Sequence, residues 1–158
     1  MGDLASVVGV NRATLFRWVG SRDTLVAEVV WSVTEPTWWT AVGRTRGTGG
    51  GRIARVLGRF SAATIDSPFF GAWVRSEPER ALRILTTNAT PFAGRFQKLM
   101  EDLLSEEVDA GRLVPPLPLH DLAYIVRRIC ESFVYADMIT GESPDAAKVE
   151  QAVKALLR

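Results

Sequence analysis

The sequence has very little cysteine and histidine and no long hydrophobic run. Cys130 and His120 are the only residues of their kinds among 158. One thiol can neither close an internal disulfide nor hold a metal cluster alone, so we expect no metal, no cofactor and a reducing, cytoplasmic setting. Chemistry that needs two imidazoles is excluded. No apolar run reaches roughly 18 residues and no basic segment precedes one at the start, which predicts neither a membrane span nor a signal peptide.

Strand-like alternation and internal repeats are also lacking, and nearly every segment has the apolar spacing of a helix. Capping residues and glycines interrupt the pattern, as at Asn11, Gly20 and Gly111. The predicted fold class is therefore all-α. The expected helices cover residues 3–8, 11–19, 21–42 with a kink or restart at Pro36, 53–65, 67–76, 78–85, 91–110, 119–139 and 144–157.

Two segments are predicted to be connections between helices. Residues 44–51 contain four glycines in eight positions, which makes a helix costly there. Residues 113–118 contain three prolines, which remove backbone donors and fix φ. The first connection divides the sequence into a predicted head, residues 1–44, and a predicted body, residues 45–158.

The net charge is only +1, but the charges are unevenly distributed. Residues 1–60 carry eight arginines and four acids, whereas the remaining residues carry 11 basic and 14 acidic side chains. A basic end beside a mildly acidic body suits an electrostatic contact with nucleic acid, although ordinary scatter of surface charge would also explain it.

Residues 4–22 have the pattern of a helix-turn-helix, in which two short helices cross around a tight turn. Ala5 is small where the helices would touch, and Gly9 suits a turn with positive φ. The second helix of such a motif lies in the major groove of DNA, where arginine can pair with guanine and threonine or alanine can meet a thymine methyl. Its outward positions here are Asn11, Arg12, Ala13, Thr14 and Arg17, and the apolar contacts inside the pair are Leu4, Val8, Val10 and Leu15.

The stretch LASVVGVNRATLFRWVGSRDTL resembles the signature of the tetracycline-repressor (TetR) family. Its typical elements are Ile-Ala, Gly-Val-Ser, Thr-Leu-Tyr, His-Phe and a lysine that opens the next helix. They match, in this order, Leu4-Ala5, Gly9-Val10-Asn11, Thr14-Leu15-Phe16, Trp18-Val19 and Arg22. The resemblance implies an all-α protein with a helix-turn-helix DNA-binding head and a helical ligand-binding and dimerisation body. The residues predicted to contact DNA are Asn11, Arg12, Ala13, Thr14, Phe16, Arg17, Trp18 and Arg22.

The sequence departs from the family signature at three points. Phe16 lacks the hydroxyl of the usual tyrosine, and Trp18 can donate an indole N–H but cannot become charged like histidine. Family members also carry a helix before the motif, whereas little precedes Leu4 in this sequence. A misplaced start, a trimmed chain or a true loss would each explain this. We expect Leu4, Val8 and Leu15 to be partly bare, and DNA binding to be weakened.

The resemblance further implies a homodimer on a palindromic operator in double-stranded DNA, with a small-molecule effector bound in the body. The apolar residues of segment 119–140 cover more than one helix face, too wide for one-sided burial, although a core within one chain is the alternative. The predicted dimer residues are Ile125, Ile129, Phe133, Val149, Val153 and Leu156. The aromatic side chains of the body favour an apolar or amphipathic effector. The residues predicted to contact the effector are Trp38, Phe69, Phe70, Trp73 and Phe96.

Two other functions remain open from the sequence. The first is a helical ligand-binding or dimerising protein that has lost DNA binding. The second, a hydrolytic enzyme, has weak support: residues 47–52 lack the Lys-Ser/Thr pair of a phosphate loop, His120 is better explained as part of a helix start, and the acidic pair Glu106-Glu107 has no partners for a metal. Cys130 lies in an apolar helix and is expected to be inert.

Overall fold

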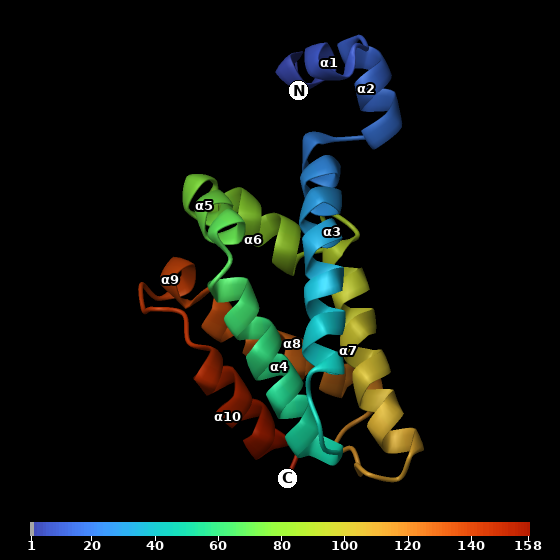
Figure 1. Cartoon of the computed structure of the whole chain (residues 1–158), viewed down its shortest axis with the longest axis vertical. Coiled ribbons are helices and arrows are strands. Elements are labelled where there is room, and N and C mark those ends of the chain that lie inside the picture. Colours follow the sequence, from blue (N-terminus) through green and yellow to red (C-terminus); the bar gives the residue numbers. More distant parts are fainter. Residues whose placement is uncertain (1) are drawn as a thin grey trace.

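The computed structural model describes residues 2–158, which form ten helices and no strand. The short helices α1 (Gly2–Val8) and α2 (Arg12–Val19) lie at one end of the molecule, above the first turn of the long α3 (Arg22–Gly43) (Figure 1). The chain ends at the opposite end of the molecule. This confirms the predicted all-α class.

The remaining helices form a bundle around the lower part of α3 (Figure 1). α4 occupies its centre and packs against α3, α7, α8 and α10. Ile53, Val56 and Leu57 of α4 are completely buried there, as expected for an apolar stripe that faces several neighbours. The helices are α4 (Gly49–Ile65), α5 (Pro68–Ser76), α6 (Pro78–Thr86), α7 (Phe92–Asp109), α8 (Leu119–Val134), α9 (Ala136–Ile139) and α10 (Ala146–Leu156).

Helix α3 passes through Pro36 without ending, so the predicted restart at this residue is wrong. Proline lacks the N–H that would bond the carbonyl of Ser32. Both residues lie on the exposed side of the helix, where an unpaired carbonyl costs little. Trp38 and Ala41, one turn further on, are buried against the bundle and hold the second half of the helix in line.

The glycine-rich connection is shorter than predicted, because α4 begins at Gly49 rather than near residue 53. A Cβ at Gly49 would lie 2.8 Å from the carbonyl oxygen of Arg112, and a Cβ at Gly50 would overlap the carbonyl oxygen of Leu157. These glycines therefore let α4 approach two other chain segments closely, which outweighs their low helix propensity.

A buried carboxylate fixes this first turn of α4. Glu107 of α7 has no exposed side-chain surface. It accepts hydrogen bonds of 2.7 Å from the backbone N–H of Gly49, from Nη1 of Arg52 and from Nε of Arg112. Burial alone would raise the pKa of Glu107, but these donors outweigh it and hold the pKa at about 2. The acidic pair that looked partnerless in the sequence is thus part of an ion-pair cluster.

The helix ends follow the sequence signals closely. Asn11, Ser21, Ser67 and Asp145 each accept a backbone N–H as N-caps. The predicted helix 119–139 is divided at Tyr135 into α8 and α9. Among the described helices, none is both long and apolar enough to cross a membrane.

Candidate functional site

The two helices of the head cross around Gly9, whose φ of +74° is in the left-handed region. The Oδ1 atom of Asn11 accepts the N–H of Thr14 at 2.8 Å and so starts α2. Ala5 and Leu15, each 4% exposed, are the buried side chains of α1 and α2. This is the geometry that the sequence predicted for residues 4–22.

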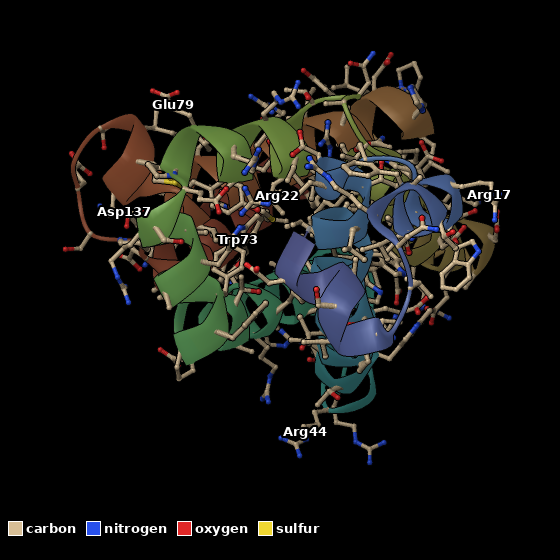
Figure 2. The ribbon with its side chains drawn as sticks, turned by 90° about the horizontal axis from the view of Figure 1, so that it is seen from above. Arg17, Arg22, Arg44, Trp73, Glu79 and Asp137 are labelled. Atoms are coloured by element: carbon tan, nitrogen blue, oxygen red, sulfur yellow. The ribbon has the colours of Figure 1, made fainter. Side chains whose placement is uncertain are left out.

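The predicted DNA contacts lie mostly on the free surface of the head. Asn11, Arg12, Ala13, Arg17 and Trp18 are exposed, and Thr14 and Phe16 are half-buried. The guanidinium of Arg12 lies over the ring of Phe16, 5.4 Å from its centroid. Seen from above the head, Arg17 projects outward at the edge of the molecule (Figure 2).

The apolar surface of α1 is only partly covered. Leu4 is 38% exposed and Val8 is 51% exposed, as expected, but Leu15 is buried. The expectation of a bare Leu15 is therefore wrong, because this side chain is on the covered face of α2, which packs against both α1 and α3.

Arg22, which lies near the centre of the view in Figure 2, differs from the other predicted DNA contacts because it takes part in an ion-pair network. Its Nη2 is 2.7 Å from Oε1 of Glu77, and the other oxygen of Glu77 is 2.5 Å from Nη1 of Arg80. Nε of Arg80 lies 3.0 Å from Asp23, which also pairs with Arg83. The two arginines hold the pKa of Glu77 below its usual range. The network ties the first turn of α3 to α6.

A small cavity of about 30 Å³ lies between α3, α4, α5, α7 and α8. Apolar and aromatic side chains form most of its wall, and two threonine hydroxyls donate to carbonyls of their own helices. Burial raises the pKa of Cys130 to about 12, so its thiol stays protonated at neutral pH. The residues that line the cavity are Thr34, Phe60, Thr64, Phe70, Phe92, Phe96, Cys130, Val134 and Tyr135.

The structure brings together part of the predicted effector contacts. Phe70 and Phe96 line the cavity. Trp38 is 1% exposed and meets the ring of Phe96 edge-on, and Trp73 meets the ring of Phe70 edge-on. Each tryptophan thus packs edge-on against an aromatic ring that lines the cavity. Phe69 lies outside this group, since it is 49% exposed.

The sequence prediction missed the two threonines and the residues of α8 in the cavity wall. Phe60 and Phe92 belonged to the apolar stripes of their helices but could not be separated from ordinary core residues. Nothing in the sequence marked Thr34 and Thr64 as cavity residues, because a threonine in a helix is as often a surface residue as a buried one.

The predicted dimer residues fall into two groups. Ile125, Ile129, Phe133 and Leu156 are half-buried and keep apolar surface that a second chain could cover. Val149 and Val153 have no exposed surface, because α10 packs on α4 of the same chain. These two valines hold the core together and cannot touch a partner directly.

Comparisons with known proteins agree with this architecture. The family described as tetracyclin repressor-like, C-terminal domain, matches residues 48–158. Among solved structures, the chain is similar to the R. erythropolis transcriptional repressor QsdR from the TetR family, with 30% sequence identity and a TM-score of 0.88. The similarity covers 98% of this chain and 81% of QsdR. No curated protein sequence matches the chain significantly. Residues 4–22, the ten described helices and both comparisons lead to one conclusion: the chain belongs to the TetR family of DNA-binding transcriptional regulators.

Proposed function

We propose that this regulator is a repressor that binds a palindromic operator as a homodimer and releases it when a small apolar or amphipathic effector enters the aromatic cavity. The proposal rests on helix α3, which connects the DNA-reading helix to the cavity. Its first turn follows the reading helix α2 directly, and Thr34, three turns further on, lines the cavity. At about 1.5 Å per residue, one continuous helix joins two sites roughly 18 Å apart.

DNA reading is assigned to the exposed face of α2. Arg12 and Arg17 can reach guanine edges or phosphates, and Ala13 and Thr14 can meet thymine methyls. Trp18, which is 60% exposed, can donate its indole N–H to a phosphate. QsdR is described as a transcriptional repressor, which favours repression here as well.

The chemistry of the cavity sets the class of effector. The described wall contains no charged side chain, so an ion would be desolvated without a partner. The lone pairs of Thr34 and Thr64 remain available to accept one hydrogen bond each. An effector with an aromatic or aliphatic body and a single donor group fits these walls best.

Release would work through the ion-pair network at the start of α3. Because an effector is larger than 30 Å³, it must displace side chains of α3, α4 or α5. Such a shift changes the position of α3 relative to α6 and therefore the contact between Arg22 and Glu77. The effector would favour a conformation in which the two reading heads of the dimer are wrongly spaced for the operator.

The dimer surface is assigned to the outer faces of α8 and α10. Ile125, Ile129 and Phe133 follow one another at helical spacing on α8, and Leu156 contributes from α10. Ala147 and Ala155 on the exposed side of α10 permit close approach of a second chain. Sedimentation velocity of the purified protein tests this assignment, and a monomer at every concentration would contradict it.

Selection from random-sequence DNA, followed by fluorescence anisotropy with the selected duplex, tests the DNA-binding part. The affinity should fall steeply as salt rises, because arginines release counterions from phosphates. Arg17→Ala should weaken binding and reduce the slope of log K against log salt by about 1 for each phosphate that the arginine neutralises in the wild type. Arg46→Ala removes the same charge at the far end of α3 and serves as the control.

Binding that shows no salt dependence, or equal weakening in both variants, would favour the alternative of a ligand-binding protein that no longer reads DNA. The effector part is tested with the same duplex: apolar compounds that bind the protein should release DNA. Compounds that bind tightly and leave the DNA affinity unchanged would refute regulation through the cavity.

A further inference from the structure

A groove of about 480 Å³ lies between α3 and α4 and shares no lining residue with the aromatic cavity. Its apolar wall consists of short side chains: Pro36 and Ala41 of α3, and Ala62 and Ala63 of α4. These short side chains leave a space between the two helices that larger ones would fill. Among the described residues, no acidic side chain lines the groove.

Two arginines line the end of the groove that lies toward the connection between α3 and α4. Arg44 comes from α3 and Arg59 from α4; both are exposed, and neither forms an ion pair in the described structure. In Figure 2, Arg44 extends outward at the lower edge of the molecule, away from every other labelled side chain. Arg46 and Arg55 add to the charge nearby, since Arg55 donates to the carbonyl oxygen of Arg46 at 2.9 Å rather than to a carboxylate.

The acidic residues of the neighbouring elements do not neutralise these four arginines. Asp66 follows the last turn of α4, seven residues and about 10 Å beyond Arg59. Glu150 of α10 packs on another face of α4, where a Cβ at Gly58 would lie 2.9 Å from its carboxylate. Glu107 already pairs with two other arginines. An excess of positive charge therefore remains at this end of the groove.

Away from the arginines, the surface of the groove becomes apolar. Pro36 lies about 12 Å from Arg44 along the axis of α3. Val33 and Val29 continue the same helix face beyond Pro36, and these two valines are 48% and 46% exposed. The groove is thus cationic at one end and apolar at the other, a distribution that complements a molecule with a negative head and an apolar chain.

From this arrangement we infer that the groove between α3 and α4 binds an amphipathic anion, a small molecule with one carboxylate or phosphate group and an unbranched apolar chain. Arg44 and Arg59 would hold the oxyanion, because a guanidinium can donate two parallel hydrogen bonds to such a group. The hydroxyls of Thr37 and Thr40 already donate to carbonyls of α3, so the arginines are the free donors of the wall. The inference depends neither on DNA binding nor on the aromatic cavity.

Decanoate and decyl phosphate are the probes, each titrated below its micelle-forming concentration into the purified full chain at constant ionic strength. Acetate has the negative head without the chain, and decyltrimethylammonium has the chain with the opposite charge, so these two compounds are the controls. We expect saturable shifts of the Ala62 and Ala63 methyl resonances with at least one probe and with neither control. The two probes distinguish a carboxylate site from a phosphate site.

Arg44→Met and Arg59→Met test the cationic end of the groove. Each removes a charge, keeps an unbranched side chain and breaks no ion pair of the described structure, so both variants should keep the Tm of the wild type. Each should weaken probe binding about two- to fivefold, and the double variant about tenfold. Arg75→Met is the matched control, because Arg75 is also exposed and without an ion pair in the described structure but belongs to α5. It should leave probe binding unchanged.

Absence of saturable methyl shifts with both probes would overturn the inference. Equal shifts with decyltrimethylammonium would do the same, because binding would then depend on the apolar chain alone. Undiminished binding by the double variant would place the anion elsewhere, for example in the aromatic cavity, and would also overturn it. If a glutamate-rich peptide bound at Ala62 and Ala63 and neither probe did, the groove would be a docking surface for an acidic protein segment, and the inference of a small amphipathic ligand would be wrong.

Discussion

Glu107→Gln should cost much more stability than an ordinary charge removal. The variant keeps the size of the side chain, but its amide nitrogen cannot accept from the donors that surround it, and one of them is left unpaired. The difference between the ordinary pKa of 4.5 and about 2 corresponds to about 3 kcal/mol at neutral pH. Arg112 is 36% exposed, so solvent screens part of this gain. We expect the free energy of unfolding to fall by about 2 kcal/mol.

The same carboxylate predicts how stability depends on pH. Since the pKa of Glu107 is lower in the folded chain than in the unfolded chain, its contribution is complete above pH 4.5 and is lost as the pH falls toward about 2. The wild type should therefore lose stability more steeply than Glu107→Gln across this window. Below it the two proteins should become similar.

Urea unfolding followed by far-UV circular dichroism measures both effects. Glu106→Gln is the control, because Glu106 is the neighbouring residue, carries the same charge and pairs with Arg52 at 3.0 Å, but is 52% exposed. It should lose less than about 1 kcal/mol. Equal destabilisation of the two variants, or equal acid dependence, would refute the role given to the buried carboxylate.

Three further predictions concern DNA binding, packing and thiol chemistry. Glu77→Gln frees Arg22 at the start of α3 and should tighten operator binding about two- to fivefold at low salt. Glu79→Gln is the control, because Glu79 has no ion pair in the described structure and points away from Arg22 in Figure 2, so operator binding should not change. Equal gains in the two variants would contradict the prediction. Gly50→Ala should lower stability by about 1–3 kcal/mol in thermal unfolding, because its Cβ would overlap a backbone carbonyl, whereas Gly51→Ala should be tolerated. Cys130 should resist iodoacetamide in the folded protein and react only on unfolding, as mass spectrometry would show; rapid labelling of native protein would argue against its burial.

Short-range signals predicted most of the secondary structure. Asn11, Ser21 and Gly9 act through bonds and dihedral angles within a few residues of themselves, so their roles can be read without the rest of the chain. Residues 4–22 were therefore predicted almost to the residue. Pro36 shows where this fails: burial of Trp38 and Ala41 by distant helices decides that the helix continues.

Long-range contacts explain the remaining errors. The glycines at 49 and 50 look like a flexible connection, but the segments that approach them are more than fifty residues away in the chain. Val149 and Val153 have the pattern of an interface, yet the same apolar face can pack on α4 or on a second chain. Thr34 became a cavity residue only through the placement of α4 and α8 around it. A sequence pattern shows that a face is buried but not by which surface.

Under the proposed function, the small size of the aromatic cavity has a consequence for how fast the protein would respond to an effector. A space of about 30 Å³ holds about one water molecule, so no effector can enter the cavity as it stands. Entry must wait until the packed rings around Phe70 and Phe96 separate. The observed association rate should then level off as the effector concentration rises, at the rate of this opening. If so, the protein itself, rather than the supply of effector, sets how quickly transcription changes.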